Sequence, residues 1–69
     1  MVGQVVFEEG NYVETVDQES NGVRLVECSE DGQPGLWRVE WEECGYYQHS
    51  AFLQYVIAEN NFINRSTGA

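Results

Sequence analysis

The 69-residue sequence contains no lysine and only three arginines, against twelve aspartate and glutamate residues, so its formal net charge is -9. A protein that binds the phosphates of nucleic acid needs a basic patch on its surface, and three arginines scattered among twelve carboxylates cannot form one. The same repulsion opposes binding to an anionic lipid surface. The composition therefore predicts that neither nucleic acid nor membrane is a direct partner.

Cysteine is also scarce, since Cys28 and Cys44 are the only two and form no close pair such as C-x2-C. Structural zinc sites usually draw on close pairs, so we expect no metal and no other cofactor, although His49 and Glu43 could join the thiols as ligands. Cys44 and His49 lack a third group that would orient them as nucleophile and base, so we expect no enzyme and no catalytic residue. Without a secretion signal the thiols are expected to stay reduced.

Long apolar runs are absent, and residues 1–5 show neither the basic nor the apolar region of a signal peptide. We therefore expect a cytoplasmic protein. The hydrophobic share of 42% and the nine aromatic residues argue against disorder, because large aromatic side chains can bury enough area to fold a short acidic chain. A chain of this length forms one small domain, which we place at residues 1–64, with a frayed tail at 65–69.

The negative charge is concentrated in residues 8–43, which hold eleven acids and two arginines and so carry the whole net charge of -9. Outside that segment Glu59 and Arg65 cancel. The carboxy-terminal third is neutral and rich in aromatic and aliphatic residues. Such an asymmetry of charge indicates an interaction surface.

Turn-forming residues divide the acidic segment into β-hairpins. Gly10-Asn11 and Asn21-Gly22 each separate two β-prone runs, and an Asn-Gly pair favours a tight type I′ turn. Residues 31–35 predict a longer loop, and a fourth strand follows over residues 36–42. The period of two in this strand places alternate residues in the core (Trp37, Val39, Trp41) and in water (Arg38, Glu40, Glu42).

Closing the hairpins at these turns predicts a register of strand pairing. The predicted pairs are Glu9 with Tyr12, Phe7 with Glu14, Glu19 with Arg24 and Asp17 with Val26. In this register Glu14 and Glu27 fall among apolar residues, whereas Val26 and Cys28 fall among the acids. Either both faces are exposed to water at the edges of the sheet, or a β-bulge shifts the register of one strand.

Residues 50–60 predict a helix with Ser50 as its N-cap. Its apolar stripe, at spacings of three and four, consists of Phe52, Leu53, Val56 and Ile57. We expect this stripe to cover the aromatic face of the sheet, and Phe62 and Ile63 to fold back onto the core. The predicted fold is therefore α+β, a four-stranded antiparallel β-meander with one C-terminal α-helix packed on one face.

A sheet with one face under a helix presents its other face to water or to a partner. Carboxylates on alternate strand residues lie about 6.7 Å apart, with neighbouring strands about 4.8 Å apart, so that face could form an array of negative charge. A sheet adapted only for solubility normally mixes signs, and the absence of lysine therefore favours a binding role. The predicted contacts with the partner are Glu8, Asp17, Glu19, Glu30, Glu40, Glu42 and Glu43.

The predicted function is that of a non-catalytic protein-binding module, most concretely an inhibitor or modulator that mimics DNA and occupies the basic nucleic-acid site of its target. Tyr46 and Tyr47, expected in the connection before the helix, are candidate aromatic anchors beside the acids. In size and acidity the chain is similar to phage-encoded inhibitors of host enzymes, a likeness that assigns no site. Two alternatives remain open: the acids only solubilise the protein, or the chain is a structural or adaptor subunit that associates through its neutral helix and aromatic surface.

Overall fold

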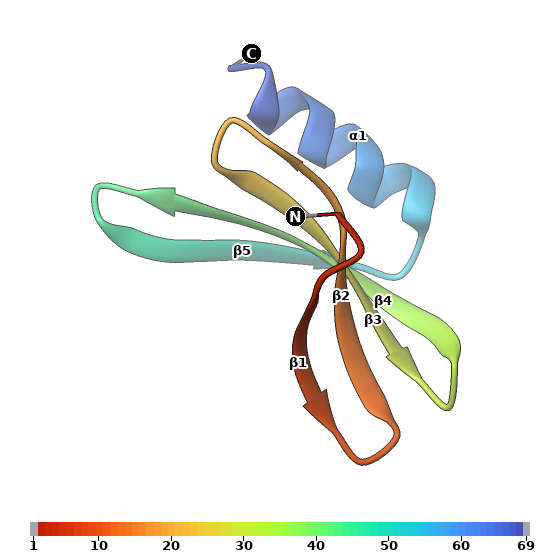
Figure 1. The fold of residues 1–69 in the computed structure, drawn as a ribbon. Coiled ribbons are helices and arrows are strands. Elements are labelled where there is room, and N and C mark those ends of the chain that lie inside the picture. Colours follow the sequence, from red (N-terminus) through yellow and green to blue (C-terminus); the bar gives the residue numbers. More distant parts are fainter. Residues whose placement is uncertain (1, 69) are drawn as a thin grey trace.

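The computed structural model describes residues 2–68, so Met1 and Ala69, at the outer ends of the predicted domain and tail, lie outside it. The described chain forms a five-stranded antiparallel sheet in the order β1-β2-β3-β4-β5, with one helix packed against one side (Figure 1). The elements are β1 Val5–Glu9, β2 Tyr12–Ser20, β3 Val23–Glu30, β4 Gln33–Glu43, β5 Tyr46–Phe52 and α1 Tyr55–Ser66. The α+β meander with a C-terminal helix is thus confirmed, with one strand more than predicted.

Two-residue turns join all the neighbouring strands, and the hairpins predicted at Gly10-Asn11 and Asn21-Gly22 are both present. The loop predicted for residues 31–35 is instead a tight turn at Asp31-Gly32. Both of these residues adopt positive φ, 55° and 77°, as a type I′ turn requires, so the chain reverses within two residues. The fourth strand therefore starts at Gln33, and its pairing with β3 contains an irregularity near the turn.

Three of the four predicted strand pairs are present, and a β-bulge displaces the fourth. Glu9 pairs with Tyr12, Phe7 with Glu14 and Glu19 with Arg24, as expected. The pairing of Asp17 with Val26 is wrong: Val16 takes that place, because the register shifts between Val16 and Gln18 and leaves Asp17 as the extra residue.

This bulge explains why apolar and acidic residues are mixed in the unshifted register. Val16 pairs with Val26 on the side of the sheet away from α1, whereas Leu25, the neighbour of Val26, packs toward the helix. Val16 is 1% exposed and Val26 and Leu25 are fully buried, so the sheet buries apolar residues on both faces.

The helix covers the face of the sheet that carries the aromatic residues. The core cluster contains Val23, Leu25, Val39, Ala58 and Phe62, with Trp37, Trp41, Phe52 and Tyr55 packed around it. Trp37, Val39 and Trp41 therefore point to the core as predicted. Below, this side is called the helix face, and the other side the opposite face.

The start of the helix and its buried side differ from the prediction. Residues 46–52 form β5, which pairs with β4 along its whole length, so α1 begins at Tyr55 after an N-cap at Gln54 rather than at Ser50. The predicted stripe faces outward: Leu53 is 77% exposed, Val56 66% and Ile57 49%. Only Phe52, now in β5, packs against the core cluster.

A second stripe at the same spacing takes the buried place on the helix. It consists of Tyr55, Ala58, Phe62 and Ser66. Both stripes fit the helical period, but this one carries two aromatic side chains, which bury more area than aliphatic ones. Phe62 thus lies in the core as expected, whereas Ile63 is 45% exposed.

The C-terminal end of α1 is bonded to the sheet by two contacts. Asn21, in the β2–β3 turn, donates a hydrogen bond to the carbonyl oxygen of Ser66 at 2.6 Å. The guanidinium of Arg65 lies 3.5 Å from the centre of the Trp41 ring, a cation–π contact. Arg65 and Ser66, assigned to the predicted tail, are therefore part of the helix and of the packed structure.

Candidate functional site

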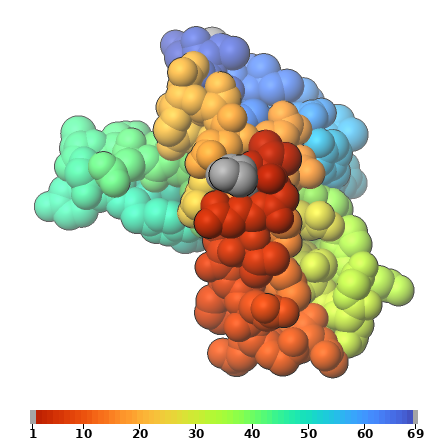
Figure 2. Space-filling model, in the orientation of Figure 1, coloured from red at the N-terminus to blue at the C-terminus, as the bar shows by residue number. Residues whose placement is uncertain are grey.

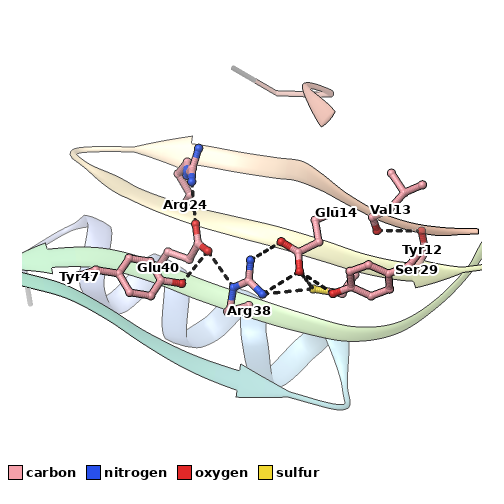
Figure 3. Close-up of polar contacts among 9 residues, drawn as sticks. Tyr12, Val13, Glu14, Arg24, Ser29, Arg38, Glu40 and Tyr47 are labelled. Atoms are coloured by element: carbon pink, nitrogen blue, oxygen red, sulfur yellow. Dashed lines mark hydrogen bonds and ion pairs between the residues drawn. The ribbon is translucent and has the colours of Figure 1, made fainter. Parts of the chain in front are cut away.

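The opposite face of the sheet carries a network of charged side chains centred on Arg38. Two guanidinium nitrogens of Arg38 donate to the two carboxylate oxygens of Glu14, at 2.6 and 3.0 Å, and its Nε donates to Glu40 at 2.8 Å (Figure 3). Glu14 is 9% exposed and Glu40 only 6%. Arg38 thus holds two buried carboxylates, one on β2 and one on its own strand.

Further donors complete the shell around these carboxylates. Arg24 donates to Oε1 of Glu40 at 2.8 Å, and the hydroxyl of Tyr47 donates to Oε2 at 2.8 Å. On the other side, the hydroxyl of Tyr12 donates to Oε2 of Glu14 at 2.5 Å. All four oxygens of Glu14 and Glu40 therefore accept at least one hydrogen bond. The six residues Tyr12, Glu14, Arg24, Arg38, Glu40 and Tyr47 are called the Arg38 network below.

The network keeps both carboxylates ionised. Hydrogen bonds from Arg38 are the main reason that the pKa of Glu14 lies below its ordinary value. Burial acts to raise the pKa of Glu40, but hydrogen bonds from Tyr47, Arg38 and Arg24 outweigh it, so this pKa is lowered too. Two carboxylates and two arginines sum to zero charge, which allows Glu14 and Glu40 to be buried on the opposite face.

The thiol beside the Arg38 network lacks the pKa shift of a reactive cysteine. Cys28 lies beside the network, with Sγ 3.9 Å from a guanidinium nitrogen of Arg38, yet burial raises the pKa of its thiol. A reactive cysteine needs the opposite shift, toward the thiolate. Both Cys28 and Cys44 are free, and within residues 2–68 no group of three or more His, Cys, Asp or Glu side chains is placed to hold a metal ion.

The expectation that Arg38 and Glu40 face water is wrong, because both belong to the Arg38 network. Glu40 therefore has no free carboxylate oxygen to offer a partner. Sequence reasoning missed the network, although one signal was present: Glu14 fell among apolar residues in the predicted register, a position that a carboxylate occupies only when it is paired.

The exposed acids gather at the hairpin turns. Seven exposed carboxylates lie in a turn or within two residues of one: Glu8, Glu9, Glu19, Glu30, Asp31, Glu42 and Glu43. We call these the turn carboxylates. The β1–β2 and β3–β4 turns lie at the same end of the sheet, where the backbone N–H of Asp31 donates to the carbonyl oxygen of Asn11 at 3.0 Å. That end carries four turn carboxylates, and the other two turns carry three.

The predicted contact residues thus fall into two groups. Five of them are turn carboxylates: Glu8, Glu19, Glu30, Glu42 and Glu43. Two are engaged inside the protein, because Glu40 belongs to the Arg38 network and Asp17, at the bulge, accepts a hydrogen bond from the hydroxyl of Tyr55 at 3.1 Å. The acids form clusters at the ends of the hairpins instead of one array across a face.

The two candidate aromatic anchors lie in β5 rather than in a loop. Tyr46 is 72% exposed and Tyr47 is 58% exposed. The ring of Tyr47 lies 5.4 Å from that of His49 while its hydroxyl bonds to Glu40. Together with Glu19, Arg24 and Glu42, Tyr47 lines an open groove of about 290 Å³ on the opposite face.

Exposed apolar side chains form a further surface on the outer side of α1. They are Leu53, Val56, Ile57 and Ile63, all at least 45% exposed. No helix in the described part of the chain is long and apolar enough to cross a membrane. Comparison of the chain with family models, with curated proteins and with solved structures gave no match.

Proposed function

We propose that the protein is a non-catalytic binding module that holds a basic partner protein through its turn carboxylates. The observation that carries this proposal is the position of the arginines. Arg24 and Arg38, the two cations of residues 8–43, are both engaged with Glu14 and Glu40 in the Arg38 network. Residues 8–43 contain eleven acids, of which Glu14 and Glu40 belong to the network. The other nine lie outside it with no arginine of this segment among them, so a charge of -9 remains outside the network.

The placement of these acids suits long-range attraction of a basic protein. Four turn carboxylates share one end of the sheet, and none of the three arginines belongs to the turns at that end. A field of one sign speeds the encounter with an oppositely charged partner, and backbone fixed by strand pairing loses little freedom on binding. The most concrete form of the proposal is an inhibitor or modulator that occupies the basic nucleic-acid site of its target, because carboxylates accept from Arg and Lys as phosphates do.

The test compares the wild-type protein with a variant in which one acidic end is neutral. This variant carries Glu8→Gln, Glu9→Gln, Glu30→Gln and Asp31→Asn, all isosteric changes at exposed positions. A second variant carries Glu19→Gln, Glu42→Gln and Glu43→Gln at the other two turns, so the two variants between them cover all seven turn carboxylates. Each protein is immobilised, exposed to a cell lysate and eluted with a salt gradient up to about 1 M.

We expect the wild-type protein to capture basic proteins that elute as the salt rises, and one of the two variants to lose them. Duplex DNA added to the captured protein should compete with the immobilised module for it. Capture that both variants retain, or that persists at about 1 M salt, would contradict the proposal.

A second candidate function rests on the outer surface of α1. Leu53, Val56, Ile57 and Ile63 give the helix an apolar outer side on an element whose Glu59 and Arg65 cancel in charge. Such a surface suits an adaptor subunit that docks by apolar contact. Binding that resists salt but is lost in Val56→Asp would favour the adaptor over the acidic module.

A further inference from the structure

The two edges of the sheet are protected very differently against pairing with another strand. Edge strand β1 carries Glu8 and Glu9, and its register with β2 is irregular. Edge strand β5, Tyr46–Phe52, contains no Asp, Glu, Lys, Arg or Pro, and pairs with β4 without a register shift. Charges, prolines and bulges are the usual means by which proteins block an edge strand, and β5 has none of them.

We propose that two copies of this chain associate through β5, in an antiparallel pairing centred on His49 that joins the two sheets into one of ten strands. This goes beyond the proposed function, because β5 carries none of the turn carboxylates. Figures 1 and 2 show the β4–β5 hairpin projecting from the body of the molecule, on a different side from α1 and from the β1–β2 turn.

The backbone of β5 provides the hydrogen-bonding groups for such a pairing. Cys44 and Gly45 have φ of 54° and 84°, the type I′ turn that directs the N–H of Tyr46 back toward Glu43. Alternate residues of an antiparallel edge strand turn their N–H and C=O outward. These groups on Tyr47, His49 and Ala51 therefore point away from β4.

The side chains of β5 are complementary to those of a second copy in this register. Tyr47 would lie opposite Ala51 of the second copy, a large residue against a small one. Tyr46 would lie opposite Phe52 of the second copy, an aromatic pair of the kind that stabilises neighbouring strands. Tyr46 and Phe52 both belong to the helix face, since Phe52 packs with the core cluster there. Tyr46, which is 72% exposed in the single chain, would thus be covered by Phe52 and the adjoining Leu53 of the second copy.

Charge also selects β5 as the edge at which two acidic copies can meet. Pairing through β1 would bring Glu8 and Glu9 of both copies together, and like charges on paired strands are destabilising. Pairing through β5 brings together strands that carry no carboxylate. The acidic β4–β5 turns would lie beyond opposite ends of the interface, about 27 Å apart along the strand, which exceeds the Debye length of about 8 Å at physiological salt.

The test measures the molar mass in solution by sedimentation equilibrium, over a range of concentrations at about 0.15 M salt. A chain of 7.9 kDa should sediment with twice that mass. His49→Glu places two carboxylates opposite each other at the centre of the interface and should give a monomer. The matched control, Val5→Glu on edge strand β1, adds the same charge and should leave the dimer intact. Circular dichroism confirms that each variant is folded.

A cross-linking experiment locates the interface independently. In a Cys44→Ser background, His49→Cys should oxidise to a disulfide-linked dimer, because directly paired residues at the centre have Cα atoms about 5.5 Å apart. Val5→Cys in the same background should not. If His49→Glu fails to fold, this comparison decides the question. A monomeric wild-type protein would overturn the proposal, and β5 would then be open to pairing with a strand of a different protein. A dimer that persists in folded His49→Glu would also overturn it.

Discussion

Arg38 reaches from β4 across the whole of β3 to bond both carboxylate oxygens of Glu14 on β2, at 2.6 and 3.0 Å. The two side chains thereby fasten three strands on the face that the helix does not cover. Removing one member of a buried ion pair leaves a charge without compensation, which costs more than the pair contributes when intact.

Substitution of Arg38 by Ala is expected to lower the free energy of unfolding by about 3–5 kcal/mol, because it leaves both Glu14 and Glu40 without their shared partner. Urea denaturation measures the change. Arg65→Ala is the control, since Arg65 is an exposed residue whose guanidinium contacts the Trp41 ring, and should cost about 1 kcal/mol or less. Equal effects of the two substitutions would show that the Arg38 network does not hold the sheet.

Acidification is expected to destabilise the protein below about pH 4.5. In the folded state the pKa values of Glu14 and Glu40 lie below the ordinary value of 4.5, so the unfolded state binds more protons as the pH falls. The stabilisation is therefore complete above pH 4.5 and is lost as the pH drops through the lowered values. Thermal unfolding at several pH values measures this.

The comparison that isolates Glu14 is Glu14→Gln, which carries no titrating group at that position. Its stability should be lower at neutral pH and should depend less on pH below 4.5 than that of the wild-type protein. Discharge of the exposed acids affects both proteins alike, so it cancels in the difference. Parallel curves for the two proteins would contradict the assignment.

Alkaline conditions are expected to weaken the contact between the helix and the bulge on β2. Burial, together with hydrogen bonds to Glu59 and Asp17, raises the pKa of Tyr55 from 10.0 to about 12. This stabilisation is complete below pH 10 and is lost as the pH rises toward 12. The pKa values of Tyr12 and Tyr47 are also raised, so ultraviolet titration of tyrosinate should show several late steps, and Tyr55→Phe should lack one of them. A wild-type titration with all of its steps near pH 10 would contradict this expectation.

The two sides of α1 should respond differently to truncation. Phe62→Ala removes a ring that is 4% exposed in the core and should cost about 3–5 kcal/mol. Val56→Ala, at a position 66% exposed, should change stability by about 0.5 kcal/mol or less. Chemical denaturation of both variants reports the difference. The reverse order would mean that the helix packs through the stripe first expected from the sequence.

Local signals in the sequence were sufficient where a turn has strong chemical preferences. Glycine and asparagine fixed the first two hairpins, and alternation fixed the core side of the strand that contains Trp37 and Val39. These features depend on a few neighbouring residues, so they can be predicted without knowing the rest of the fold.

The features that could not be predicted depend on residues distant in sequence. The helix has two stripes with the same period, and only the packing of Tyr55 and Phe62 against the sheet decides between them. The Arg38 network joins four strands, and the bulge at Asp17 determines which side of the sheet carries Glu14. Glu40, which the sequence predicts as an exposed residue in contact with a partner, is for this reason an internal partner of two arginines.

The seven turn carboxylates have a consequence for how this chain can vary. They are exposed at the turns, whereas the core cluster and the Arg38 network lie along the strands and under the helix. Substitution at the turns changes the charge that approaching molecules meet without altering the interior. Under the proposed function, affinity for the partner and the ability to fold are thus encoded in separate sets of residues, so selection can adjust one without loss of the other.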